Sequence, residues 1–144
     1  MQVKSILKAK GSRVVTVSPL TTIDALAHRL RLENIGAVIV SSDGASVDGI
    51  ISERDVLRGL AEHGADLLAM SVVDLMTRGV QTCRPDADVK EVMRLMTQKR
   101  IRHLPVVDGG RLLGIVSIGD VVKNRLDDME MEANVLRDYA IARG

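Results

Sequence analysis

Two short segments of the chain place a serine and an aspartate three residues apart. They read GIISERDV at residues 49–56 and GIVSIGDV at residues 114–121. A serine followed three residues later by an acid can form a capping box at a helix N-terminus, and this structural role alone explains a single copy. A helix N-terminus also presents free N–H groups and a positive dipole end, which suit a phosphate. The serine hydroxyl can donate to a phosphate oxygen, and the carboxylate can accept from two ribose hydroxyls.

Positive charge stands at the edge of an apolar run in the segment RIRHLPVV, residues 100–107. Arg102 and His103 directly precede Leu104 and Pro105, where a buried strand has little use for a guanidinium. One interpretation is a surface arginine paired with an acid beside a half-buried histidine. The other is an anion site, since both side chains suit a phosphate.

Other chemistry has no support in the sequence. GIVSIG has the glycine spacing of a P-loop, but Asp120 stands where the lysine must be. No G-x-G-x-x-G follows a strand, so a Rossmann fingerprint is absent. His28 and His63 have no partners at metal-ligand spacing. We find no nucleophile–base pair and no carboxylate dyad, and we expect neither an enzyme nor a metal site.

Composition limits the classes of partner. The 144 residues are 46% hydrophobic with a net charge of +1, which predicts one folded domain without a strong field toward nucleic acid. Tyr139 is the only aromatic residue, so bases cannot stack on aromatic platforms. Cys83 is the only cysteine, which excludes an intrachain disulfide and favours a reducing compartment. With no long apolar run and no signal-peptide pattern, we expect a cytoplasmic protein without membrane or nucleic-acid binding.

The elements that must position these residues occur twice. VVTVSPLTTIDALAHRL (14–30) aligns with VQTCRPDADVKEVMRLM (80–96) at an offset of 66 residues. The segment at 37–57 aligns with that at 103–123, and VKSIL (3–7) and VVDLM (72–76) introduce the two copies. Because one copy buries too little surface alone, we expect the copies to pack face to face about a pseudo-twofold axis. Such packing creates two equivalent clefts.

Each copy predicts strand, helix, strand, strand, helix. VVTV and VQTC are β-branched runs that end near a proline. Apolar residues then follow at helical spacing, from Ile23 in the first copy and from Val89 in the second. We expect Asp86 to cap the second of these helices. A hairpin turn and a final helix after Ser52 or Ser117 complete each copy.

The order and duplication of these motifs resemble a tandem of CBS domains, also called a Bateman module, over residues 3–123. The resemblance rests on VVDLMT (72–77), RIRHLPVVD (100–108) and the twice-used GI[IV]SxxDV. It implies an α/β fold of two β-α-β-β-α repeats, here at residues 1–65 and 66–123. Beyond the family unit we expect an amphipathic extension of the last helix, at 124–144. The resemblance also implies a regulatory site for an adenosyl ligand.

The resemblance assigns residues from both copies to each cleft. Cleft 1 takes from the first copy Ile50, Ser52, Arg54 and Asp55, and from the second Arg78, Gly79, Val80, Ile101, Arg102, His103 and Pro105. Cleft 2 takes from the first copy Ser12, Arg13, Val14, Ile35, Gly36 and Ala37, and from the second Ile115, Ser117, Gly119 and Asp120. The clefts are unequal, because Gly36 and Ala37 stand where the second copy has Arg102 and His103.

We expect this module to sense an adenine nucleotide and to signal to a regulated protein that the sequence does not identify. The modest number of basic residues favours AMP, then NAD(H), with ADP and ATP as further alternatives. A second hypothesis is a scaffold protein that keeps the fold and has lost the ligand. Both Ser-x-x-Asp motifs are intact, which argues against that loss.

A heptad-like stripe follows the second copy. Its apolar residues are spaced 4, 3, 4, 3 and 4 apart: Val122, Leu126, Met129, Ala133, Leu136 and Ala140. The stripe can lie back on its own domain, or it can contact a second subunit. Since small CBS pairs commonly form dimers, the resemblance favours a homodimer, although so short a stripe cannot hold a dimer alone.

Overall fold

Apolar side chains at helical spacing form one buried helix in each repeat. The computed structural model describes residues 1–11 and 13–143, in which α2 spans Ile23–Glu33 and α5 spans Val89–Lys99. Each helix buries three apolar side chains, beginning with Ile23 and Val89 as predicted. Asn34 and Arg100, at equivalent positions, end the helices with φ of 53° and 54°. The two repeats therefore match down to the backbone at the helix ends.

The predicted cap of α5 was wrong by two residues. Asp88, not Asp86, is the N-cap, and its side chain accepts a hydrogen bond of 2.9 Å from the backbone N–H of Lys90. Thr22 takes the equivalent place in α2. Asp86 instead pairs with Arg84 at 3.3 Å, because it lies in the turn before the helix begins.

Strands of each repeat form a small sheet. In the first, the order is β1–β2–β3, with β1 (Thr16–Val17) parallel to β2 (Ala37–Val40) and β2 antiparallel to β3 (Gly49–Ser52). In the second, β4 (His103–Asp108) and β5 (Arg111–Ser117) form a hairpin. Gly109 and Gly110 join them with φ of 58° and 78°, the left-handed pair that a tight hairpin turn requires.

The strand predicted at VQTC is reduced to one bridge. Cys83 pairs with Val106, the equivalent of the Val17–Val40 pair in the first repeat. Pro105 stands where the first repeat has Ile39, and proline has no N–H to donate. The parallel ladder therefore cannot extend toward Val80 as it extends from Val17 to Thr16.

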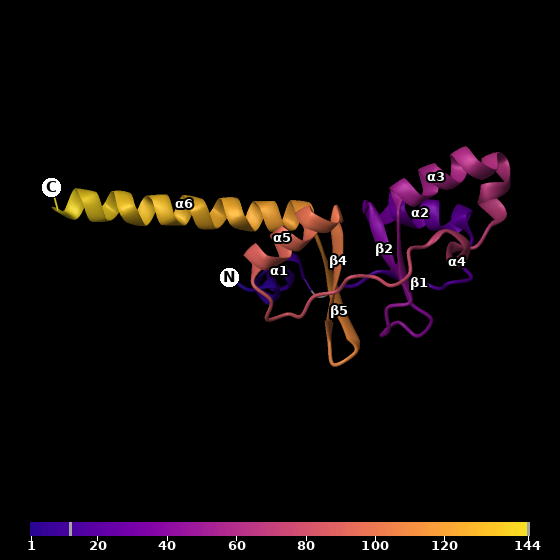
Figure 1. Ribbon diagram of the computed structural model, residues 1–144, viewed down its shortest axis with the longest axis horizontal. Coiled ribbons are helices and arrows are strands. Elements are labelled where there is room, and N and C mark those ends of the chain that lie inside the picture. The colour runs from indigo at the N-terminus through magenta and orange to yellow at the C-terminus, as the bar shows by residue number, and fades with distance from the viewer. Residues whose placement is uncertain (12, 144) are drawn as a thin grey trace.

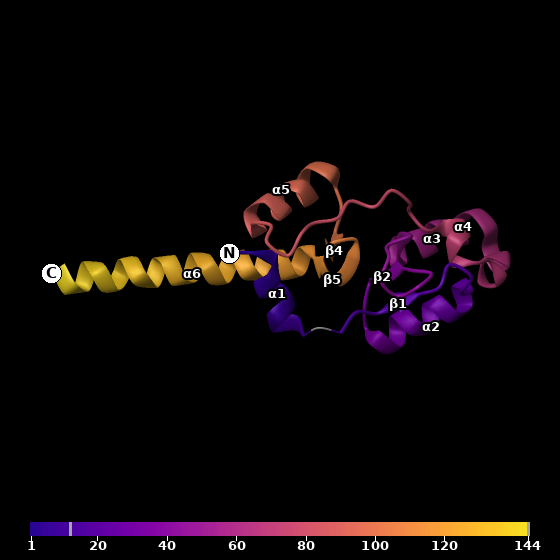
Figure 2. The ribbon, with the colours of Figure 1, turned by 90° about the horizontal axis from the view of Figure 1, so that it is seen from below.

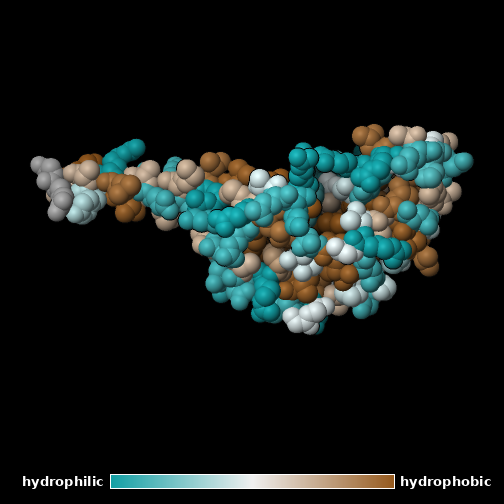
Figure 3. All heavy atoms as spheres, viewed as in Figure 1, coloured by the Kyte–Doolittle hydropathy of each residue, from teal (hydrophilic) through white to brown (hydrophobic). Residues whose placement is uncertain are grey.

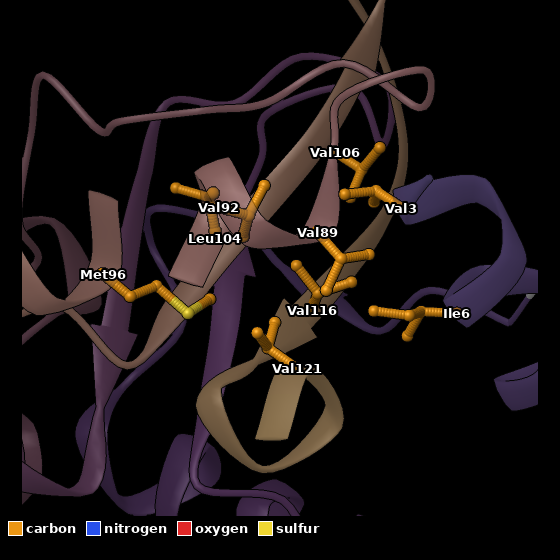
Figure 4. Packing of buried hydrophobic residues seen from close by; sticks show 9 residues of the cluster. All are labelled: Val3, Ile6, Val89, Val92, Met96, Leu104, Val106, Val116 and Val121. Atoms are coloured by element: carbon orange, nitrogen blue, oxygen red, sulfur yellow. The ribbon is translucent and has the colours of Figure 1, made fainter. Parts of the chain in front are cut away.

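The helices that introduce the repeats are exchanged between them. α1 (Val3–Lys10) buries Val3 and Ile6 in the core of the second repeat, which Figure 4 shows. α4 (Val72–Leu75) buries Val72 in the core of the first. The N–H of Val3 donates to the carbonyl of Ala87 (2.9 Å), and that of Val72 to the carbonyl of Thr21 (2.8 Å), an equivalent pair. Each repeat is thus completed by the segment that precedes the other.

Two helices begin at the Ser-x-x-Asp motifs, as predicted. α3 spans Glu53–His63 and leads into a 3-10 turn at Gly64–Ala69. α6 spans Ile118–Arg143. It leaves the body of the molecule after its first turns and projects away from both repeats (Figures 1 and 2). The predicted C-terminal helix is therefore a continuation of the last helix of the second repeat.

Candidate functional site

Both Ser-x-x-Asp motifs form the capping boxes that their spacing predicts. The backbone N–H of Ser52 donates to Asp55 Oδ2 and that of Ser117 to Asp120 Oδ2, each at 2.9 Å. In return, the serine hydroxyls accept from the aspartate N–H groups at 3.4 and 3.2 Å. The structural role is therefore real in both copies, and it fixes each carboxylate beside a helix N-terminus.

A cavity of about 530 Å³ lies between the two repeats at the N-terminus of α3. It brings together seven residues expected in cleft 1: Ile50, Ser52, Arg54, Asp55, Ile101, Arg102 and His103. Gly36 and Ala37, which the resemblance assigned to cleft 2, also line this cavity. They reach it because Ala37 pairs with Ser52 across β2 and β3, and because the carbonyl of Gly36 accepts from the N–H of Glu53 at 2.9 Å.

Both repeats contribute apolar and charged side chains to the wall of this cavity. Ile50 and Ile101 supply apolar surface from opposite repeats. The arginines that line it are Arg54, Arg58, Arg100 and Arg102, against the acids Glu53 and Asp55. Asp55 is buried, and its Oδ1 lies 3.4 Å from Arg58 Nη2. The cavity therefore offers one buried carboxylate, a helix N-terminus and several guanidinium groups within one space.

His103 stands between the two clefts. It lines the cavity and also pairs with Ser117 across the β4–β5 hairpin. Burial lowers the pKa of His103 below its usual value, and the charges of Lys10 and Arg102 lower it further, while Asp120 and Glu53 oppose the shift. The lowered pKa favours the neutral imidazole, and a bound anion would favour its protonation.

Lys10 fills the polar end of cleft 2. Its Nζ lies 2.8 Å from Asp120 Oδ2 and 3.0 Å from the carbonyl oxygen of Ile115. Burial acts to raise the pKa of Asp120, but hydrogen bonds from Lys10 and Ser117 outweigh it, and the pKa is lowered. The exchange of α1 onto the second repeat carries Lys10 to this place. Both carboxylates thus lie beside a cation, Asp55 beside Arg58 at 3.4 Å and Asp120 beside Lys10 at 2.8 Å, but only Asp55 lines the cavity at α3.

The structure places the remaining expected residues outside the cavity at α3. Arg78 and Gly79 are exposed, Val80 is half-buried, and Pro105 is buried within β4. In cleft 2, Arg13 pairs with Glu33 at 2.8 Å, Val14 is half-buried, and Gly119 is exposed. Ile35 lines a separate cavity of about 450 Å³ beside α2 and α3. Ser12 lies outside the described residues.

The sequence analysis missed five residues of the cavity wall: Glu53, Leu57, Arg58, Thr77 and Arg100. Arg58 was available to prediction, since it follows Asp55 by three residues on one helix face. Arg100 was harder to predict, because it reaches the cavity from the left-handed residue that ends α5. Thr77 is held there by paired backbone hydrogen bonds with Ile50, of 2.9 and 3.0 Å.

Among the described residues, other reactive side chains are not gathered into a second site. Burial raises the pKa of Cys83 to about 11, so this thiol is protonated and unreactive at neutral pH. Within residues 1–11 and 13–143, no three His, Cys, Asp or Glu side chains are grouped closely enough to hold a metal ion. In the same residues, no helix has the length and apolar character needed to cross a bilayer.

Two matching repeats, exchanged leading helices and a cavity between the repeats define the class of this protein. The chain belongs to the CBS domain family, which it matches over residues 3–62 and 72–127. It is 45% identical to the CBS-domain containing protein ATU1752 from Agrobacterium tumefaciens, whose crystal structure superposes with a TM-score of 0.83. That match covers 87% of this chain and 99% of the other.

A curated relative is longer than this chain. The mitochondrial CBS domain-containing protein CBSX3 of Arabidopsis thaliana is 36% identical over 135 residues, or 91% of this chain. The chain spans 65% of the length of CBSX3, and 57% of that of the Methanopyrus kandleri protein MK0525.

A related structure contains a nucleotide. The crystal structure of CBSX2 in complex with AMP is 27% identical, with a TM-score of 0.75 over 89% of this chain and 98% of the other.

Proposed function

We propose that this protein is a regulatory module that binds AMP, or a related adenosyl nucleotide such as NAD(H), ADP or ATP, in cleft 1. The observation that carries the proposal is the cavity of about 530 Å³, which joins Ser52 and Asp55 of one repeat to residues 101–103 of the other. Its volume lies within the range of about 300–1,000 Å³ typical of ligand pockets. The AMP complex of CBSX2 supports this ligand class.

Each part of an adenosyl nucleotide has a matching wall in the cavity. Ile50 and Ile101 are the apolar surfaces on which adenine would lie, in the absence of any aromatic side chain there. The Asp55 carboxylate would accept from the ribose hydroxyls. The phosphate would lie at the N-terminus of α3, where backbone N–H groups and Arg102 stabilise negative charge. With four arginines in its wall, the cavity could neutralise more phosphate charge than the sequence suggested.

Only one of the two clefts is proposed to bind. In cleft 2 the Asp120 carboxylate already accepts from Lys10, and a ribose would have to displace that ammonium group. Breaking a half-buried ion pair without replacing its charge is unfavourable. We therefore expect one nucleotide per chain.

The ligand would act by changing how the two repeats are held together. Because its contacts come from both repeats, bound nucleotide stabilises one relative arrangement over others, and a partner protein can recognise that difference. The module itself is proposed to carry out no reaction. Its partner is to be found by experiment.

Thermal unfolding across a panel of nucleotides tests this function. The panel contains adenine and guanine mononucleotides, NAD⁺, NADH and S-adenosylmethionine. A ligand present at about a hundred times its dissociation constant should add about 2.7 kcal/mol to the free energy of unfolding. We expect adenosyl compounds to stabilise the protein and guanine nucleotides to fail. If none of these compounds stabilises the protein, the scaffold hypothesis is favoured over the nucleotide-sensing module.

A further inference from the structure

Exposed apolar side chains are concentrated on α6. Eight of the fifteen exposed large hydrophobic side chains in the described part of the chain belong to this helix. Figure 3 shows brown, hydrophobic atoms along the projecting rod, interspersed with hydrophilic ones. From residue 129 to residue 142 every side chain is exposed. Because most helical stability comes from packing, an uncovered helix of this length should be marginal in water.

The apolar stripe of α6 is open along its whole length. Val122, Leu126, Met129 and Leu136 are 43%, 60%, 55% and 69% exposed. Ala133 and Ala140, which complete the heptad spacing, are exposed as well.

The body of the molecule contacts another face of α6. Val121 is buried against it, and Asn124 and Asp128 are half-buried. At about 100° per residue, the centre of this face lies about a third of a turn from the stripe. The stripe can therefore take a second helix without displacing the body.

The charged residues beside the stripe favour a second α6 as the partner helix, in the parallel orientation. In a parallel, in-register pair, the residue before each a position faces the residue five further along the other helix. These contacts set Arg125 against Glu130 and Glu132 against Arg137, so that both are attractive. In an antiparallel pair with the same apolar layers, Lys123 would face Arg137, and Glu130 and Glu132 would each face their own copy.

We propose that α6 pairs in parallel with α6 of a second copy of this chain through the stripe from Val122 to Ala140, as one of the contacts that hold a homodimer together. The inference is independent of the nucleotide site. The family match ends at residue 127, so most of the pairing segment lies beyond it.

The pair Glu132–Arg137 is the most informative to change. Neither residue has an ion pair within the described part of the chain, whereas Arg125 already lies 3.6 Å from Asp128. Residues five apart on one helix point about 140° away from each other, so Glu132 and Arg137 of the same chain cannot meet. Any coupling between them must cross a dimer interface.

The test is a charge-reversal series on the full chain, followed by sedimentation velocity and light scattering. The wild type should be a dimer. Glu132→Lys and Arg137→Glu should each weaken dimerisation about tenfold, because two symmetric attractive contacts become repulsive. The double variant E132K/R137E should restore it. Circular dichroism of each variant controls for loss of the helix, and Leu136→Lys should weaken dimerisation more than either charge reversal does.

Crosslinking determines the direction. In a Cys83→Ser background, Ala140→Cys should form a disulfide-linked dimer, since the two residues face each other only in a parallel pair. A monomeric wild type would overturn the proposal. So would a dimer that the charge reversals leave unchanged, or one in which A140C fails to crosslink.

Discussion

Asp55 and Asp120 perform the same structural task but differ in what surrounds them. Each closes a capping box, yet Asp55 faces the cavity and Asp120 faces Lys10. Replacing either by alanine should cost about 1 kcal/mol of folding stability from the lost hydrogen bond to the serine N–H. The two substitutions are therefore matched controls for one another.

We expect Asp55→Ala to weaken AMP binding about a hundredfold or more. Two charge-assisted hydrogen bonds to ribose are lost, each contributing about 1.5–3 kcal/mol. Asp120→Ala should leave the affinity within about threefold, since its carboxylate is ion-paired elsewhere. Fluorescence competition or calorimetry measures both. Strong loss with D120A and none with D55A would move the site to cleft 2.

His103 should make binding sensitive to pH. Its pKa is lowered in the free protein, chiefly by burial, and a neighbouring phosphate would raise it. Binding then takes up a proton, so affinity should increase as pH falls from 8 to 6. Each unit by which the pKa rises contributes up to about tenfold at low pH.

The control for this pH dependence is His103→Gln. The phosphate of AMP itself titrates near pH 6, so the informative quantity is the ratio of wild-type to variant affinity at each pH. That ratio should grow as pH falls. A constant ratio would show that His103 does not change its protonation when the ligand binds.

At the scale of elements, glycine marks where each leading helix crosses a hairpin. A Cβ on Gly49 would lie 2.7 Å from Met76 Sδ and 2.8 Å from the Thr77 carbonyl oxygen. A Cβ on Gly114 would lie 2.7 Å from Leu7 Cδ2. The glycine of GI[IV]S is thus explained by the close approach of the exchanged helix.

The two glycines should differ in their tolerance of alanine. Gly49→Ala should destabilise the protein by about 1–3 kcal/mol, because the Thr77 backbone cannot move aside without opening the cavity wall. Gly114→Ala should cost less, since the Leu7 side chain can rotate. Urea unfolding measures both. An equal or larger cost for G114A would contradict the packing described for α1.

Local rules explain which elements were predictable. Helices α2 and α5, the hairpins and the capping boxes follow from spacing and caps within a few residues. The exchange of α1 and α4 could not be predicted by these rules, because both are short apolar segments that fit either of two similar cores. The position of Lys10 depends on that exchange. Cleft 2 could therefore be named from the sequence, but its occupation by a lysine could not.

For the molecule as a whole, the duplication gives the architecture, and the two clefts depart from it. The repeats are equivalent in their folds but not in their clefts, since Asp55 lines the cavity whereas Asp120 accepts a hydrogen bond from Lys10. Beyond the repeats, α6 continues past residue 127, where the family match ends, and projects from the body of the molecule. A module with one ligand site and one self-association helix per chain would couple two ligands within a dimer.

The central claim is that one adenosyl nucleotide binds per chain between the repeats. Calorimetric titration of AMP into the full chain tests it most directly, with protein concentration fixed by amino-acid analysis. We expect a single class of sites with a stoichiometry of one per chain, and no heat of binding for GMP. Two AMP molecules per chain, or no binding at millimolar AMP and none of any other adenosyl nucleotide, would contradict the account.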